Sequence, residues 1–204
     1  MQGRTTIIGL AGGSGTGKST IAAHLVRLGG VHIDADRIGH DLLARDADVI
    51  AMVRAAFGGE IVGAGGAVDR RALGRRVFSD PEALRRLGAI VHPAILRGCA
   101  AAVGAAAAAG EPLAVVDAAL LLEVETRIAW DLTIALRCPR PERVRRIMAK
   151  GGWSEEEVRL RLDSQAHVEK SFYKADAVVD TGRRMEEVLA EVDRVVAARL
   201  GGAP

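Results

Sequence analysis

The sequence predicts an α/β fold of three layers, in which a parallel β-sheet is flanked by helices. Short apolar runs alternate with longer segments of helical period, which is the pattern of parallel βαβ units. A glycine-rich loop separates the first apolar run from an amphipathic segment. With 204 residues, of which 49% are hydrophobic, the chain has room for one compact domain. We therefore expect residues 1–204 to form a single domain.

Five short apolar segments have the character of buried strands. They are residues 5–10 (TTIIGL), 31–34 (VHID), 113–117 (LAVVD), 132–136 (LTIAL) and 177–180 (AVVD). The second and third of these end at Asp34 and Asp117, so both acids are expected at the carboxyl edge of the sheet, where α/β folds bind ligands.

Helical periodicity follows the glycine-rich loop over residues 19–28 and returns over 38–43 and 49–57. Residues from about 68 to 109 carry no strand signal and predict an all-helical insert. Within it, 69–78 is amphipathic, and a cap with a first-turn proline at Pro81 begins another helix.

Proline is expected to interrupt that helix at His92 and Pro93, because it removes a donor and disfavours helix at the residue before it. The alanine-rich residues 100–109 then predict a separate helix. Towards the carboxyl end we expect a basic helix over 141–150, a hinge at Gly151 and Gly152, a helix opened by a capping box at 154–157, and a last helix over 185–200.

Composition excludes several classes of protein. The formal charge is +2, from 28 basic and 26 acidic residues, so the basic excess of a nucleic-acid-binding protein is missing. The two cysteines, Cys99 and Cys138, exclude a disulfide scaffold and are expected to be reduced core thiols of a cytoplasmic protein. No signal peptide or membrane-spanning segment is expected, and the sequence does not define the oligomeric state.

The glycine-rich loop fits the phosphate-binding pattern G-x-x-x-x-G-K-[ST] over residues 12–19, between a predicted strand and a predicted helix. Its glycines allow backbone N–H groups to converge on phosphate oxygens, and the helix adds its positive end. Lys18 is expected to span the β- and γ-phosphates of ATP, and the Ser19 hydroxyl to hold Mg²⁺. The nucleotide-binding candidates are Gly13, Ser14, Gly15, Thr16, Gly17, Lys18, Ser19 and Thr20.

Carboxylates near the sheet edge supply the next candidates. One of Asp34 and Asp36 could accept a proton from an attacking hydroxyl, and one could cap the following helix. Asp117 could hold Mg²⁺ through water, as a Walker B acid does, although an acid that caps a strand-to-helix turn is an equal alternative. Glu123 is expected to be a helix-surface acid, and His92 to be structural.

The basic segment 140–150 and the hinge after it suit a lid that brings cations over the triphosphate, or else a solvated face. We expect the lid to extend over about 140–170.

Taken together, the motifs resemble those of the dephospho-coenzyme A kinase family, and the resemblance runs through most of the chain. The blocks that carry it are GLAGGSGTGKST at 9–20, IDAD at 33–36, VDRRALGRRVFSDPEAL at 68–84, VHP at 91–93, LLLE at 120–123, RVRRIMAK at 143–150, Gln165 with Glu169 and Lys170, and ADAVVD at 175–180.

The resemblance implies a P-loop kinase fold with a five-stranded parallel sheet, and transfer of a phosphoryl group from ATP to the 3′-hydroxyl of dephospho-CoA, the last step of CoA biosynthesis. It places the family's base at Asp36. It also implies a CoA-binding insert over about 59–110, between core segments of about 1–58 and 111–204, in which Arg70 and His92 become candidate substrate contacts. Arg146 and Lys150 become the cations of the lid.

Three positions depart from the family pattern. Ala119 stands where the family has proline, Thr181 follows Val179 and Asp180 where the family has I-D-N, and Lys150 stands where it has arginine. Lysine keeps the charge but loses the planar fork that grips two phosphate oxygens. A nucleoside or nucleotide kinase of the same architecture, or a regulatory protein that only binds nucleotide, remains an alternative.

Overall fold

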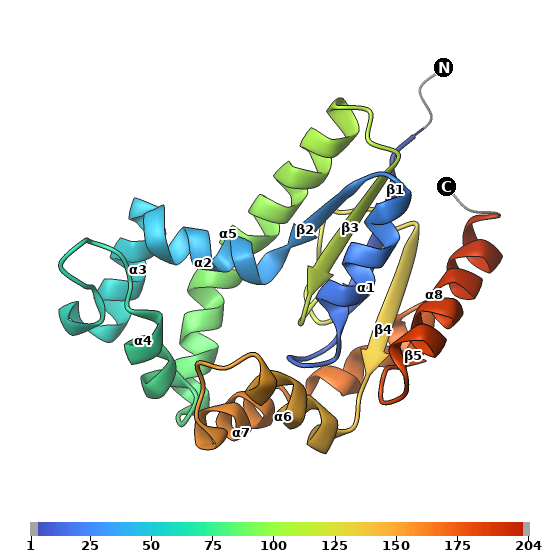
Figure 1. Ribbon diagram of the computed structural model, residues 1–204. Coiled ribbons are helices and arrows are strands. Elements are labelled where there is room, and N and C mark those ends of the chain that lie inside the picture. The colour runs from blue at the N-terminus through green and yellow to red at the C-terminus, as the bar shows by residue number, and fades with distance from the viewer. Residues whose placement is uncertain (1–3, 202–204) are drawn as a thin grey trace. The chain divides into compact units, whose positions relative to one another are not determined.

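A five-stranded, fully parallel sheet forms the centre of the fold, in the order β2-β3-β1-β4-β5 (Figure 1). The computed structural model describes residues 4–201. The strands are β1 (Thr6–Ala11), β2 (Val31–Asp34), β3 (Leu113–Ala118), β4 (Leu132–Arg137) and β5 (Ala177–Asp180). All five predicted strands are confirmed, with bounds that differ by at most a residue at either end.

Strand order brings the ends of three distant segments to one edge of the sheet. Asp117 on β3 is in register with Leu10 on β1 and with Asp34 on β2. The glycine-rich loop leaves β1 at this edge, because carboxyl ends of parallel strands coincide. The loop therefore starts beside Asp117.

One face of the sheet is covered by α1 (Lys18–Leu25) and α8 (Met185–Leu200). Their buried residues pack on alternate strand positions, since successive side chains on a strand point to opposite faces. The core members are Ile8, Leu10, Ile21, Ala22, Leu25, Leu113, Val115, Leu132, Ile134, Leu136, Val179, Val188, Val192 and Val196. On β4, Ala135 points the other way and packs with Val168 and Phe172 of the 3₁₀ segment Val168–Lys174.

The chain divides into two compact units, residues 1–34 with 100–204 and residues 35–99. The second unit contains α2 (Ala35–Arg45), α3 (Ala47–Phe57), α4 (Arg70–Val77) and most of α5 (Pro81–Ala108). Its own core includes Val53, Phe57, Leu73 and Val77. This compact unit begins at residue 35, because α2 and α3 share a core with the helices that follow them.

Helix α5 is a single helix of 28 residues with Pro93 inside it, so the predicted interruption at His92 and Pro93 is wrong. Proline in a helix costs about 3 kcal/mol through one lost hydrogen bond and a clash. Here Val91 and Ala94, on either side of it, are buried in the core of the second unit, and this burial outweighs the local cost. The alanine-rich segment after residue 100 continues the same helix.

In the part of the chain that the structure describes, α5 also has the length and apolar composition of a membrane span. Length and composition alone do not make α5 a membrane span, so the expectation that no segment spans a membrane stays a prediction. Alanine raises the mean hydropathy of this helix without adding bulk. A core helix of a soluble protein meets the same criteria of length and composition, so these are weak evidence for a membrane span.

The basic helix α6 (Arg140–Ala149) and α7 (Glu155–Ser164) pack together through Ile147, Val158 and Leu162, with Trp153 against them. Ser154 and Glu157 form the predicted capping box. Gly151 and Gly152 between the helices both have positive φ, which glycine adopts without strain. The remaining short elements are the 3₁₀ turns Val26–Leu28 and Gly59–Ile61.

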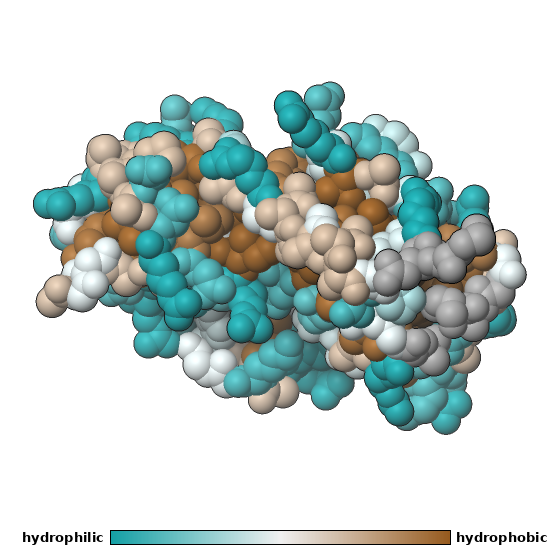
Figure 2. Space-filling model, turned by 90° about the horizontal axis from the view of Figure 1, so that it is seen from above, coloured by the Kyte–Doolittle hydropathy of each residue, from teal (hydrophilic) through white to brown (hydrophobic). Residues whose placement is uncertain are grey.

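Seen from above, the surface mixes hydrophilic and apolar residues (Figure 2). Among the described residues, the exposed large hydrophobic side chains are Met52, Met148, Tyr173 and Val178.

Candidate functional site

The phosphate loop leaves β1 at Ala11 and enters α1 at Lys18, as its motif predicted. Gly17 precedes the helix in the left-handed conformation, with φ of 90°. Gly15 also has positive φ, and a Cβ there would lie 2.9 Å from the carbonyl oxygen of Arg143. Glycine at position 15 is therefore required twice, by the turn and by the close approach of α6.

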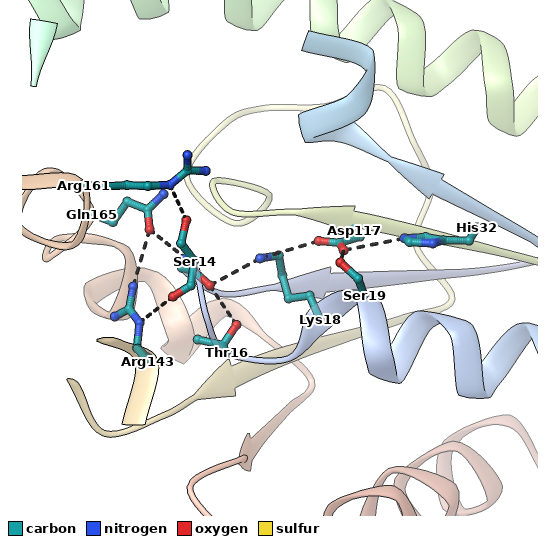
Figure 3. Close-up of polar contacts among 10 residues, drawn as sticks. Ser14, Thr16, Lys18, Ser19, His32, Asp117, Arg143, Arg161 and Gln165 are labelled. Carbon is teal, nitrogen blue, oxygen red and sulfur yellow. Dashed lines mark hydrogen bonds and ion pairs between the residues drawn. The ribbon is translucent and has the colours of Figure 1, made fainter. Parts of the chain in front are cut away.

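The structure brings Lys18, Ser19 and Asp117 together (Figure 3). The Lys18 Nζ lies 3.6 Å from Asp117 Oδ1 and donates to the carbonyl oxygen of Gly13 at 3.3 Å. The Ser19 hydroxyl donates to Asp117 Oδ2 at 3.0 Å. Both side chains are buried. A buried ammonium group is costly unless it is paired, so the carboxylate of Asp117 is what makes the buried position of Lys18 tolerable.

His32 on β2 is a further neighbour of this carboxylate, and its Nε2 lies 3.6 Å from Asp117 Oδ2. Burial would raise the pKa of Asp117, but the imidazole of His32, the charge of Lys18 and the hydroxyl of Ser19 together bring it below its ordinary value. Asp117 is therefore an anion at neutral pH. Sequence reasoning missed His32, since its place depends on β2 lying next to β3.

Three residues of the lid segment hold Ser14 of the loop (Figure 3). Arg143 Nε donates to the Ser14 carbonyl oxygen at 2.8 Å, and Arg161 Nε donates to the Ser14 hydroxyl at 2.7 Å. The Ser14 N–H donates to Gln165 Oε1 at 2.7 Å, and Arg143 Nη2 donates to the same oxygen at 3.4 Å. Arg143 is buried, and burial lowers the pKa of its guanidinium. The sequence indicated Ser14 as a nucleotide-binding candidate and placed Arg143 and Gln165 in family blocks, but it predicted none of these contacts and did not indicate Arg161.

Arg146 connects α6 to the loop after β5. Its Nη2 donates to the Thr181 carbonyl oxygen at 2.7 Å and its Nε to Glu142 at 2.8 Å. Hydrogen bonds from Arg145 and Arg146 lower the pKa of Glu142 to about 2. The Thr181 hydroxyl in turn lies 2.8 Å from the carbonyl oxygen of Thr16. Arg146 is thus joined to the phosphate loop through one residue.

Lys150 caps the carboxyl end of α6 and is exposed. Its backbone N–H donates to Ile147 at 3.2 Å, which closes the last turn. Gly151 and Gly152 follow directly.

The other predicted site residues belong to the second unit. Asp36 lies in the first turn of α2 and is exposed, two residues after β2 ends. Arg70 begins α4, whose N-cap, Asp69, accepts from the backbone N–H groups of residues 71 and 72. His92 is half-buried on α5, and burial lowers its pKa.

Glu123 is not on a helix, contrary to the prediction. It lies in a turn after β3, where its Oε2 is 3.2 Å from His167 Nε2. The apolar run at 120–122 does not continue as a helix, because Leu120 and Leu122 pack with Val168 and Phe172 against the sheet.

The residues around Asp117 suit Mg²⁺, which prefers oxygen ligands and takes one or two from protein beside those of phosphate. Ser19 Oγ and Asp117 Oδ2 lie 3.0 Å apart, the spacing of two adjacent ligands on one ion. Within residues 4–201, no three His, Cys, Asp or Glu side chains are grouped as a metal site. A cation here would depend on the phosphate oxygens of a nucleotide.

Comparison with known proteins identifies the family. The family model described as dephospho-CoA kinase matches residues 6–187. A dephospho-CoA kinase of Leifsonia xyli is 38% identical over 196 residues, which cover 96% of this chain and 99% of that one. The crystal structure of TT1252 from Thermus thermophilus has a TM-score of 0.75 at 36% identity, over 98% of this chain and 100% of that one.

A dephospho-CoA kinase structure from Campylobacter jejuni has the same fold, with a TM-score of 0.62 at 24% identity over 96% and 98% of the two chains. The match of the family model covers far more than half of the sequence, and the curated relative is matched along its full length. The chain belongs to the dephospho-CoA kinase family.

Proposed function

We propose that this chain transfers the γ-phosphoryl group of ATP to the 3′-hydroxyl of dephospho-CoA, with Mg²⁺ as cofactor. The observation that carries the proposal is the meeting of Lys18 and Ser19 with the buried anion of Asp117 at the phosphate loop. In a chain of this family, these residues form the part of the kinase site that binds the triphosphate of ATP.

The nucleotide is held by the loop from Gly13 to Thr20. Its backbone N–H groups and the positive end of α1 face the phosphates, and Lys18 exchanges the Gly13 carbonyl for phosphate oxygens. Ser19 and Asp117 hold Mg²⁺, which offsets charge on the β- and γ-phosphates when it is bound.

Asp36 is the general base of the proposed reaction. Its carboxylate accepts the proton of the 3′-hydroxyl as that oxygen bonds to the γ-phosphorus, and the bond between the γ-phosphorus and the β,γ-bridging oxygen breaks to release ADP. Its exposed position in the first turn of α2 makes this carboxylate accessible from solvent. Arg70 and His92 are proposed contacts of the acceptor, within an insert of about residues 59–110.

Arg146 and Lys150 supply the cations of a lid over about residues 140–170. Arg146 is already in place beside Thr181, whereas Lys150 stands at the glycine hinge. Positive charge from these two side chains would offset the charge that spreads over the transferring group.

We place the reaction in the cytoplasm, on a small-molecule acceptor and without a nucleic-acid or membrane partner. The buried thiols of Cys99 and Cys138 suit a reducing compartment. The nearly balanced charge of +2 gives no support to a nucleic-acid partner.

Release of ADP from Mg·ATP tests the proposal, with 3′-dephospho-CoA, adenosine, uridine, AMP and CMP compared as acceptors. We expect strong stimulation by dephospho-CoA alone, with CoA as the product. Stimulation by a nucleoside or nucleotide would keep the chemistry of the phosphate loop and overturn the acceptor. If ATP binds but no acceptor raises ADP release, the chain is a nucleotide-binding protein and the proposal fails.

A further inference from the structure

The imidazole of His32 lies beside the Ser19–Asp117 pair with an unsatisfied ring nitrogen. Its Nε2 is buried and, within residues 4–201, has no hydrogen-bond partner. The carboxylate of Asp117, 3.6 Å away, is the group it faces. The contact with Asp117 is longer than a normal hydrogen bond, and a buried polar atom without one is costly, so a ligand shared with Asp117 would satisfy this nitrogen.

Strand register explains why His32 points at the site. His32 is paired with Val115 and Asp34 with Asp117 across β2 and β3, so His32 and Asp117 share one face of the sheet. Val115 packs with Ile21 of α1 on that face. The ring therefore lies on the side where α1 begins with Lys18 and Ser19 (Figure 3).

The two oxygens of Asp117 have different neighbours. Oδ1 faces Lys18 Nζ at 3.6 Å, whereas Oδ2 lies 3.0 Å from Ser19 Oγ and 3.6 Å from His32 Nε2. Adjacent ligands about 2.1 Å from one octahedral ion are about 3.0 Å apart, and opposite ones about 4.2 Å. The 3.6 Å between His32 Nε2 and Asp117 Oδ2 lies between these two values, so the geometry allows both atoms to be ligands of one ion.

We propose that His32 donates Nε2 directly to the divalent cation that Ser19, Asp117 and the nucleotide phosphates hold. The inference rests on the proposed function, which assigns the cation to Ser19 and Asp117. An imidazole ligand favours transition metals, whereas Mg²⁺ prefers oxygen. The affinity of the site for Mn²⁺ or Co²⁺, relative to its affinity for Mg²⁺, is therefore higher than that of an all-oxygen site.

Electron paramagnetic resonance of Mn²⁺ with ADP and the full-length protein tests this inference. We expect hyperfine coupling to ¹⁴N of one imidazole, replaced by ¹⁵N coupling when the protein is labelled with [¹⁵N]histidine. In His32→Val the coupling disappears and the dissociation constant of Mn²⁺ in the presence of ADP rises at least about tenfold, because the loss of even an outer-shell partner costs about 10- to 100-fold in metal affinity. The Mg²⁺ constant, measured by competition, changes less.

His24→Ala is the matched control, since His24 on α1 is paired with Asp193 at 2.7 Å. It should keep both the coupling and the Mn²⁺ affinity. Isotope labelling keeps the test decisive even if His32→Val does not fold.

The inference fails if Mn·ADP binds wild-type protein without nitrogen coupling. If, in that case, the Mn²⁺ affinity still falls in His32→Val, His32 acts only by orienting Asp117. If Mn²⁺ binds no more tightly with ADP than without it, the assignment of the cation to Ser19 and Asp117 fails, and the inference with it.

Discussion

The Nε–H of Arg143 donates to the carbonyl oxygen of Ser14 across 2.8 Å, which ties the basic helix α6 to the phosphate loop. The guanidinium is buried, and its Nη2 also reaches Gln165. The backbone of Arg143 in turn lies against Gly15. Arg143 is therefore a positioning residue that fixes the path of the loop from outside it.

Arg143→Gln should weaken both folding and nucleotide binding. A buried hydrogen bond to a charged group contributes about 1.5–3 kcal/mol, and its loss also leaves the Ser14 carbonyl without this donor. We expect a lower free energy of unfolding in urea and a higher KM for ATP. Arg145→Gln is the control, because Arg145 is exposed on the same helix and, within residues 4–201, pairs only with its neighbour Glu142. Equal behaviour of the two variants would contradict the positioning role.

Thr181 holds the loop from the other side, and Thr181→Val should destabilise the protein by about 1 kcal/mol. Its hydroxyl has a single proton and lies 2.8 Å from the Thr16 carbonyl oxygen and 3.1 Å from that of Arg137, so the shorter bond is favoured. Urea unfolding measures the change. Thr181→Ser keeps the hydroxyl and should restore most of the lost stability; if it does not, the methyl group and its packing are responsible.

Much of the fold could be predicted because local patterns and tertiary structure agree. All five strands were predicted, and the motif located Lys18 and Ser19. The continuous α5 could not be predicted, because the cost of Pro93 is local whereas the burial of Val91 and Ala94 that outweighs it is tertiary.

The same distinction separates the predicted from the unpredicted parts of the site. Asp117 was found from the end of its strand. His32 could be placed only once β2 was known to lie beside β3, and Arg143 only once α6 was docked on the loop. Nothing in the spacing of those residues along the sequence indicates either contact.

Lys150→Ala should weaken the hold on ATP, seen as a higher KM, a lower kcat, or both. Lys150 is exposed at the end of α6 beside two glycines with positive φ, and the proposed lid would bring its charge to the triphosphate. Lys150→Arg should equal or exceed the wild type, because the guanidinium grips two oxygens at once. Lys174→Ala, at another exposed lysine, is the control. Unchanged kcat and KM in Lys150→Ala would exclude Lys150 from the lid.

The free energy of unfolding should fall in mild acid, because the half-buried ring of His92 becomes protonated. Burial lowers its pKa from the ordinary 6.5, so the unfolded chain binds the proton more readily than the folded one. The stability contributed by the neutral ring is present above about pH 6.5 and is lost as the pH falls towards the lower, folded pKa. Urea unfolding between pH 5 and 8 should show a shallower pH dependence in His92→Gln.

Asp36→Asn provides the sharpest test of the proposed chemistry. The amide keeps the size of the side chain but cannot accept the proton of the 3′-hydroxyl, so kcat should fall by about 10²- to 10⁴-fold. ATP affinity, measured by direct binding, should be unchanged, because the phosphate contacts of Lys18 and the loop remain. Asp41→Asn is the matched control, since Asp41 is an exposed acid on the same helix. Retained turnover in Asp36→Asn would move the base elsewhere; lost ATP binding would mean that Asp36 acts on the nucleotide and not on the acceptor.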